Sequence, residues 1–195
     1  MKTKSLLFAV ALVFAAAQMA TAATYTVDNV HSQVHFKVAH LVVANVRGVF
    51  NDYTAKIEAD PAKKTVQNVE AVIKIASIDT RNQKRDEHLR SADFFDAANH
   101  PEMTFKSTKI SGSGDDVTVV GNLTIRGNTR PVTLKGSFSG EVKDPWGNTK
   151  AGFEATGKIN RQDFGLTWNK ALETGGLVVG DEVEIGLEIE AARAQ

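Results

Sequence analysis

The sequence predicts an all-β protein, most simply an antiparallel up-and-down β-barrel with a short helical insertion. Four stretches in the back half of the chain alternate apolar and polar residues with period two, so that side chains would point to opposite faces of a sheet. Turn residues bound each stretch, and helical patterns are not interleaved with the strands, which argues against a βαβ fold. A two-sheet sandwich fits the same pattern and is the structural alternative.

The front half is expected to contribute four strands. We place them at residues 25–27, 32–40, 48–59 and 69–75, the third ending at Asp60-Pro61. The period then changes: residues 81–89 are highly polar and rich in helix formers, so a helix is expected there. Ser91 is expected to cap a short turn over residues 92–95, and Pro101 ends this insertion before the alternation resumes.

The back half holds the clearest strands, each with one apolar face. The apolar residues of these faces are Val117, Val119, Leu123 and Ile125; Val132, Leu134 and Phe138; Phe153, Ala155 and Ile159; and Val183, Ile185, Leu187 and Ile189. Turns rich in Gly, Asp and Asn separate them at 112–116, 127–128 and 144–148. The count is eight or nine strands, and a barrel of about eight leaves room for side chains or one slender ligand.

The first residues have the pattern of a cleavable export signal. Lys2 and Lys4 precede the apolar residues 5–17, and Ala20-Thr21-Ala22 supplies a small-x-small site that would be cut before Ala23. This apolar run is shorter than the ~20 residues that span a bilayer. We therefore expect a signal peptide at 1–22, one barrel domain at 23–195, and no integral membrane span in the mature chain.

Composition excludes several classes of function. The chain has no Cys, which rules out disulfides, thiol chemistry and Cys-ligated metals. Its 23 basic and 23 acidic residues balance, so nucleic acid is not expected as a partner. His31 and His35 share strand parity while His40 has the opposite parity, so no metal site is predicted. Neither a sharp-turn serine motif nor a phosphate-binding glycine loop is present.

Two polar segments leave alternatives open. Asp86 and His88 could form a general acid/base pair, or belong to a helix whose charges pair with one another at a barrel end. Arg161 could pair with Asp86 or Asp163 and fix one loop to another. Apolar residues also occur in loops, at 41–43, 94–95, 168 and 177–179. They either pack over the barrel ends or form the apolar mouth of a tunnel for a long ligand.

Taken together, these motifs resemble the YceI-like family of exported bacterial proteins. The resemblance runs through residues 23–195. The residues that carry it are His31-Ser32 with Val34, Phe36 and His40; Gly48 and Phe50; Ile78 and Thr80; Arg85-Asp86 with His88-Leu89; Asp93-Phe94-Phe95-Asp96; Pro101 with Phe105; Gly121 with Leu123-Thr124-Ile125 and Gly127; Pro131-Val132; Asn160-Arg161 with Asp163-Phe164-Gly165; and Gly180-Asp181-Glu182-Val183.

The resemblance implies an extended, eight-stranded, lipocalin-like antiparallel barrel partly covered by a helix. It further implies a periplasmic protein that is not an enzyme, requires no cofactor, and holds a polyprenol, an isoprenoid quinone or a similar long-chain amphiphile inside the barrel.

If the apolar parity faces the lumen, a set of large apolar residues is expected to line it, with His40 near the ligand head group. The expected lining residues are Phe36, Val38, Phe105, Leu134, Phe138, Phe153 and Trp168. One alternative is an enzyme of lipid or quinone metabolism that uses Asp86, His88 or His40. Another is a stress or adaptor protein whose barrel is only a scaffold. An edge strand or the loop at Leu177 could also form the face of a homodimer.

Overall fold

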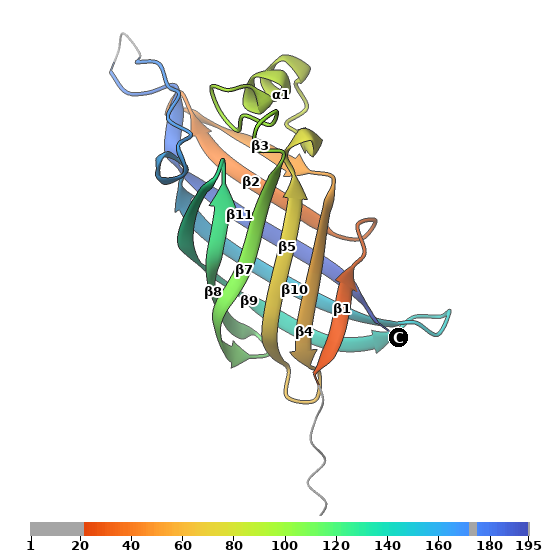
Figure 1. The fold of residues 1–195 in the computed structure, drawn as a ribbon. Helices are drawn as coiled ribbons and strands as arrows, with labels where there is room; N and C mark the ends of the chain where they lie inside the picture. Colours follow the sequence, from red (N-terminus) through yellow and green to blue (C-terminus); the bar gives the residue numbers. More distant parts are fainter. Residues whose placement is uncertain (1–21, 172–174, 195) are drawn as a thin grey trace, which may run out of the picture.

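The computed structural model describes residues 22–171 and 175–194, which form a β-barrel with one short α-helix (Figure 1). The predicted signal peptide therefore lies, up to residue 21, outside the described residues. The elements are β1 (Ala23–Val27), β2 (Gln33–His40), β3 (Ala44–Phe50), β4 (Tyr53–Asp60), β5 (Thr65–Lys74), η1 (Ile75–Ser77), β6 (Ile78–Asp79), α1 (Gln83–Arg90), β7 (Glu102–Ser113), β8 (Asp116–Ile125), β9 (Asn128–Lys143), β10 (Thr149–Asn160), η2 (Arg161–Phe164) and β11 (Val179–Arg193).

The strands close into a ring in which every neighbouring pair is antiparallel. The order is β1-β4-β5-β7-β8-β9-β10-β11, and β11 pairs back with β1. β2 and β3 do not take positions of their own in this ring. β1 and β2 both pair with β11 and together form one interrupted strand; β4 pairs with β1 and β3 with β2, and these two form the next interrupted strand. The eight-stranded barrel is confirmed, and the sandwich is excluded because the ring closes.

The interruption between β1 and β2 is bridged by Ser32. Its hydroxyl donates to the Glu190 carbonyl at 3.0 Å and accepts from the Glu190 N–H at 2.9 Å. The Asp28 N–H also donates to the Glu190 carbonyl at 2.9 Å, so the Ser32 hydroxyl replaces the backbone acceptor that a continuous strand would have supplied to the Glu190 N–H. The hydrogen-bonded ladder of the barrel therefore continues past residues 28–32, where the first strand bends.

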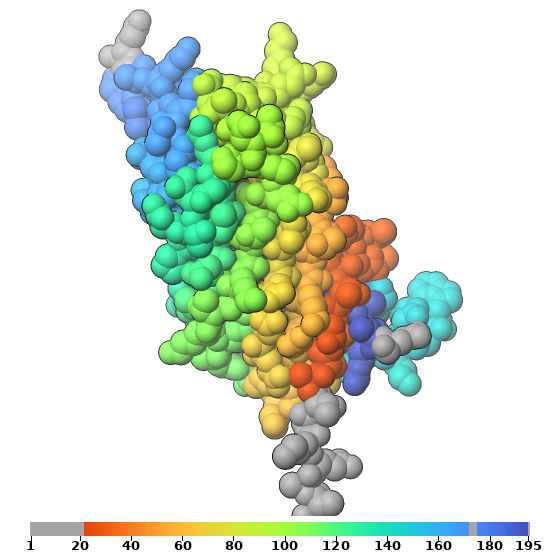
Figure 2. Space-filling model, in the orientation of Figure 1, coloured from red at the N-terminus to blue at the C-terminus, as the bar shows by residue number. Residues whose placement is uncertain are grey.

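The helical insertion lies over one end of the barrel. α1 begins after Asn82, whose side chain accepts from the Arg85 N–H at 3.0 Å, and the expected turn follows, with the Ser91 hydroxyl accepting from the Asp93 N–H. Figures 1 and 2 show α1 and the turns after it covering the upper end, while the carboxyl end of β11 lies toward the opposite end. Within the described residues, no helix has both the length and the apolar character needed to cross a bilayer.

Three aromatic side chains close the end of the barrel away from the helix. Phe138 stacks on Phe153 with ring centroids 4.6 Å apart, and Tyr25 meets both rings edge-on. The Tyr25 hydroxyl donates to Glu141 at 2.7 Å, which satisfies the polar atom of a fully buried residue. We call Tyr25, Phe138 and Phe153 the base cluster.

Candidate functional site

An apolar cavity of about 260 Å³ occupies the barrel between the base cluster and the helical insertion. A single water molecule needs only about 10–15 Å³ of such space. Inward-facing residues such as Ile185, Leu187 and Ile189 are only half-buried although they point into the barrel. They are half-buried because they face the cavity rather than other side chains. The space is therefore a continuous internal chamber with an almost wholly apolar wall.

Five of the eight residues predicted as ligand contacts lie in the cavity wall. They are Phe36, Val38, Phe105, Leu134 and Phe153, from β2, β7, β9 and β10. Each lies on the apolar parity of its strand, which the barrel turns inward. That these five touch a bound ligand stays a prediction.

The structure places the other three predicted contacts outside the wall. Phe138 is fully buried in the base cluster, and Trp168 lies in the loop between η2 and β11, where its ring packs against Phe94. His40 ends β2, where it pairs with Ala44 and Val179 beyond the last wall residue of that strand. Strand parity predicts the face on which Phe138 and His40 lie but carries no information on their height in the barrel. Trp168 lies in a loop, where strand parity gives no prediction.

The largest wall residues lie flat because glycines face them. A Cβ on Gly48 would lie 2.4 Å from Cζ of Phe36, and one on Gly121 would lie equally close to the Phe105 ring. On β10, Gly157 gives the same room to Leu134. Each glycine lets a bulky neighbour lie against the sheet. The barrel axis therefore stays open although the wall is built from large side chains.

Replacing Gly48 with Ala is expected to narrow the cavity. The new methyl group would push the Phe36 ring inward, because its nearest neighbours are side-chain atoms of Phe36 and Thr80. We expect affinity for a neutral apolar fluorophore such as N-phenyl-1-naphthylamine to fall about fivefold, as overpacking by about 1 kcal/mol would produce. Gly152→Ala is the control, since its methyl group would make only ordinary contacts with Ser139. Equal affinity of the two variants would contradict the role of Gly48.

Small residues that sequence inspection did not select also shape the chamber. Ala55 and Ala71 are cross-strand partners on β4 and β5, and both lie in the wall beside Phe105. The detectable signal was an alanine at an inward position of each of two neighbouring strands. Tyr53, the first residue of β4, also lines the cavity and was not among the predicted ligand contacts, although it lies within the predicted strand 48–59.

Arg161 holds the loops at the upper end of the cavity together. Its guanidinium donates to the carbonyls of Leu166, Trp168 (3.0 Å) and Gly180 (2.8 Å), and it pairs with Asp181 at 3.2 Å. The side chain is 4% exposed, and burial lowers its pKa. The expected partners, Asp86 and Asp163, were wrong. The anchoring role is as expected, but most of the acceptors are backbone carbonyls, which a sequence does not reveal.

The residues of the predicted acid/base pair have separate structural partners. Asp86 is buried and accepts from the N–H and hydroxyl of Thr80, at 2.9 and 2.5 Å. His88 contacts Asp93 at 2.8 Å, and its ring packs edge-on against Phe94 and Trp168. These contacts fix the insertion to the barrel end and to the loop that carries Trp168.

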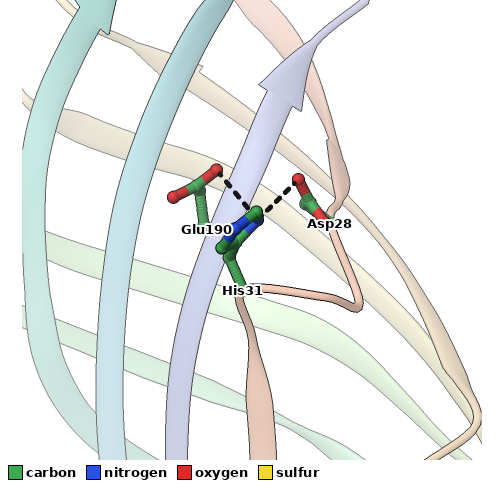
Figure 3. Close-up of side chains that lie close together, drawn as sticks. All are labelled: Asp28, His31 and Glu190. Atoms are coloured by element: carbon green, nitrogen blue, oxygen red, sulfur yellow. Dashed lines mark hydrogen bonds and ion pairs between the residues drawn. The ribbon is translucent and has the colours of Figure 1, made fainter. Parts of the chain in front are cut away.

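A polar cluster on the outer side of the barrel joins the bend after β1 to β11. His31 lies 3.2 Å from Asp28 and 3.8 Å from Glu190 (Figure 3). Lys150 lies 2.6 Å from Asp28 and 3.1 Å from Glu190, and its hydrogen bond lowers the Asp28 pKa. The Lys150 ammonium balances one of the two negative charges and forms ion pairs with both carboxylates, so the cluster is best described as an ion-pair network that fixes the bend.

Apolar residues gather at the tip between β2 and β3, at the upper end of the barrel. Val42 and Val43 are 76% and 86% exposed, and Leu41 donates its N–H to the Val178 carbonyl at 2.9 Å, which brings the Leu177 loop alongside. Leu177 is also exposed. The tip continues from Val38 and Val179, which line the cavity. That this tip and the Leu177 loop form the mouth of a ligand tunnel, or the face of a homodimer, stays a prediction.

Comparison with known proteins gives one consistent family. A profile of the YceI-like domain matches residues 25–191. Protein YceI of Salmonella newport is 36% identical over 195 residues, with 99% of both chains covered. The crystal structure of the YceI protein of Campylobacter jejuni superposes with a TM-score of 0.70 at 37% identity, covering 82% of this chain and 91% of that one.

A more distant structure shares the fold. It is described as a polyisoprenoid binding domain from Saccharophagus degradans, and it superposes with a TM-score of 0.61 at 15% identity, covering 87% of this chain and 98% of that one. At this identity the likeness concerns the barrel fold alone.

Proposed function

Because this chain belongs to the YceI-like family and encloses an apolar chamber, we propose that it binds a long-chain isoprenoid or a related amphiphilic lipid inside the barrel. A polyprenol and an isoprenoid quinone are two candidate ligands whose slender apolar chains suit such a space. The protein would act as a carrier that keeps the chain of such a lipid away from water.

The observation that carries this proposal is the cavity and its apolar wall. Burial of apolar surface yields about 25 cal/mol per Å², or about 0.8 kcal/mol for each methylene. Several isoprene units could therefore offset the loss of translational freedom and of chain entropy on binding. The polyisoprenoid named for the Saccharophagus domain is consistent with this ligand class, but the likeness to that domain does not extend beyond the fold.

The alternatives receive less support from the described residues. An enzyme would need an acid or base directed at the ligand, whereas Asp86 and His88 are engaged by Thr80 and by Asp93. A protein whose barrel is only a scaffold would be expected to pack it with side chains, as the base cluster does at one end. An open chamber above that cluster favours ligand binding.

We also propose that the protein acts in the periplasm, on the basis of the export signal at residues 1–22. Expression of the full chain in a Gram-negative host, followed by osmotic release and intact-mass measurement, tests this. The expected product begins at Ala23 in the periplasmic fraction. A full-length product retained in the cytoplasm would contradict the proposal.

The ligand itself is best tested by native mass spectrometry of protein purified from that fraction. We expect a discrete added mass that is released by organic solvent and identified as an isoprenoid lipid. A bare polypeptide mass, unchanged after incubation with isoprenoid quinones and polyprenols, would contradict lipid binding.

A further inference from the structure

The two tyrosines of this chain are both buried but differ in one respect. Tyr25 is 0% exposed and its hydroxyl donates to Glu141 at 2.7 Å. Tyr53 is 4% exposed, and its hydroxyl is buried without a hydrogen-bond partner among the described residues. A buried hydroxyl that forms no hydrogen bond destabilises the folded protein, and such groups are rare in native structures.

The unpartnered hydroxyl belongs to a residue of the cavity wall. Tyr53 shares the inward face of β4 with Ala55 and Ile57, and all three line the chamber. Ile57 of β4 pairs with Tyr25 of the base cluster, and from Ile57 to Tyr53 the strand spans about 13 Å at ~3.3 Å per residue. Tyr53 therefore lies well above the closed base, along the path that a bound chain would follow.

The other two buried atoms without a partner have local explanations. Oδ2 of Asp60 lies 3.3 Å from Nζ of Lys63, which forms an ion pair with it. Nδ1 of His35 belongs to a ring that packs across Gly186 of β11, on the strand parity opposite to the inward-facing Val34 and Phe36. Tyr53 is thus the case in which the unpartnered hydroxyl belongs to an inward-facing residue of the chamber wall.

The state of this hydroxyl limits what it can recognise. Burial, with a smaller contribution from the Asp28 carboxylate, raises the pKa of Tyr53, so the group stays protonated at neutral pH and can donate. Arg161 is the only lysine or arginine among the described wall residues, and carbonyls and Asp181 already engage its guanidinium. A charged phosphate or diphosphate in the chamber would lose its hydration without a counter-ion.

We propose that Tyr53 is a specificity-determining residue that donates a hydrogen bond to a neutral oxygen of the bound lipid. The ligand would be an amphiphile whose carbonyl, ether or hydroxyl oxygen lies inside the barrel at Tyr53, with an apolar chain along the remaining wall. Its polar end is then enclosed by the barrel, in contrast to a head group held outside at His40. Tyr53 can act in this way only if the barrel binds an amphiphile, as proposed above.

The test uses two probes that share a decyl chain and differ in the head. One is a decyl-substituted dimethoxybenzoquinone, and the other is decylbenzene, which has no oxygen. Delipidated mature protein is dialysed to equilibrium against each probe, and bound probe is quantified by chromatography. We expect Tyr53→Phe to weaken quinone binding about three- to tenfold, the effect of one hydrogen bond, and to leave decylbenzene binding unchanged.

Tyr25→Phe is the matched control, because it removes the same oxygen atom from a buried tyrosine outside the cavity wall. It is expected to lower the melting temperature and to leave the ratio of quinone to decylbenzene affinity unchanged. Tyr53→Phe is expected to melt no lower than the wild-type protein in the absence of ligand, since no hydrogen bond is lost.

The outcomes separate this assignment from lipid binding as such. If wild-type protein binds both probes and Tyr53→Phe changes neither affinity, or changes both equally, the role of Tyr53 is overturned while lipid binding stands. If wild-type protein binds neither probe nor any longer isoprenoid, the proposed function fails. A lowered melting temperature of unliganded Tyr53→Phe would show that its hydroxyl has a structural partner, and would also overturn the assignment.

Discussion

Replacing Ala71 with Phe is expected to abolish lipid binding while the barrel stays folded. Ala71 lies in the cavity wall between its cross-strand partners Ala55 and Phe105, where a small side chain leaves the axis open. A phenyl ring at this position would project into a chamber of about 260 Å³. If the ring displaces about four carbon atoms of the ligand chain, the loss is about 3 kcal/mol, or roughly a hundredfold in affinity.

The stability of the Ala71→Phe protein should be equal to or above that of the wild type, because an apolar ring in an apolar cavity adds burial. Val72→Phe is the matched control: it places the same ring on the outer face of the same strand, outside the cavity wall. Native mass spectrometry after incubation with an isoprenoid quinone measures the result. Retention of the lipid by Ala71→Phe at the level of Val72→Phe would mean that the ligand does not occupy this chamber.

Replacing Arg161 with Leu is expected to cause the largest loss of stability. The substitution leaves the carbonyls of Leu166, Trp168 and Gly180 without their donor and Asp181 without its cation. Removal of one member of a buried, hydrogen-bonded charge network costs about 3–5 kcal/mol. For a domain of this size that corresponds to a fall in melting temperature of about 10 °C.

Thermal unfolding followed by circular dichroism tests this, with Arg130→Leu as the control. Arg130 is exposed, and among residues 22–171 and 175–194 its guanidinium donates to the carbonyl of the preceding residue alone, so its loss removes the same charge with little effect. Because Arg161 also fixes the loops at the upper end of the cavity, we expect Arg161→Leu to release a bound lipid faster than Arg130→Leu. If the two variants melted at the same temperature, Arg161 would not be the anchor of these loops.

The barrel could be predicted because alternation is a local property of the chain. The four apolar faces from Val117 to Ile189 are all directed inward, and the polar insertion before Pro101 became α1 and its turns. The separation of residues 25–27 from residues 32–40 was predicted, but the division of the predicted strand 48–59 into β3 and β4 was not. Nor did the sequence show that β1 and β2 form one interrupted barrel strand, because that depends on a bend bridged by Ser32 and Glu190, residues that lie far apart in the sequence.

Within the candidate site, the sequence predicted correctly which face of the sheet a side chain lies on, but not its position along the barrel axis. Phe36 and Phe105 lie in the wall because their parity turns them inward. Phe138 has the same kind of parity, but it lies in the base cluster, where Tyr25 and Phe153 fill the space around it. The position of a residue along the barrel axis depends on how the strands are staggered around the closed ring, and the sequence of a single strand does not contain this information.

The sequence by itself therefore determined the strand class of this protein, the inward face of each clear strand, the helical insertion and the family, because each is written in short-range periodicity or in motif order. Only the tertiary structure decided where the barrel is filled and where it is open, which carbonyls engage Arg161, and which of two buried tyrosines has a partner. Those properties arise from contacts between residues brought together by closure of the ring. The hydrogen-bonding groups are present in any conformation of the chain, but their pairing and the cavity form only when the ring closes.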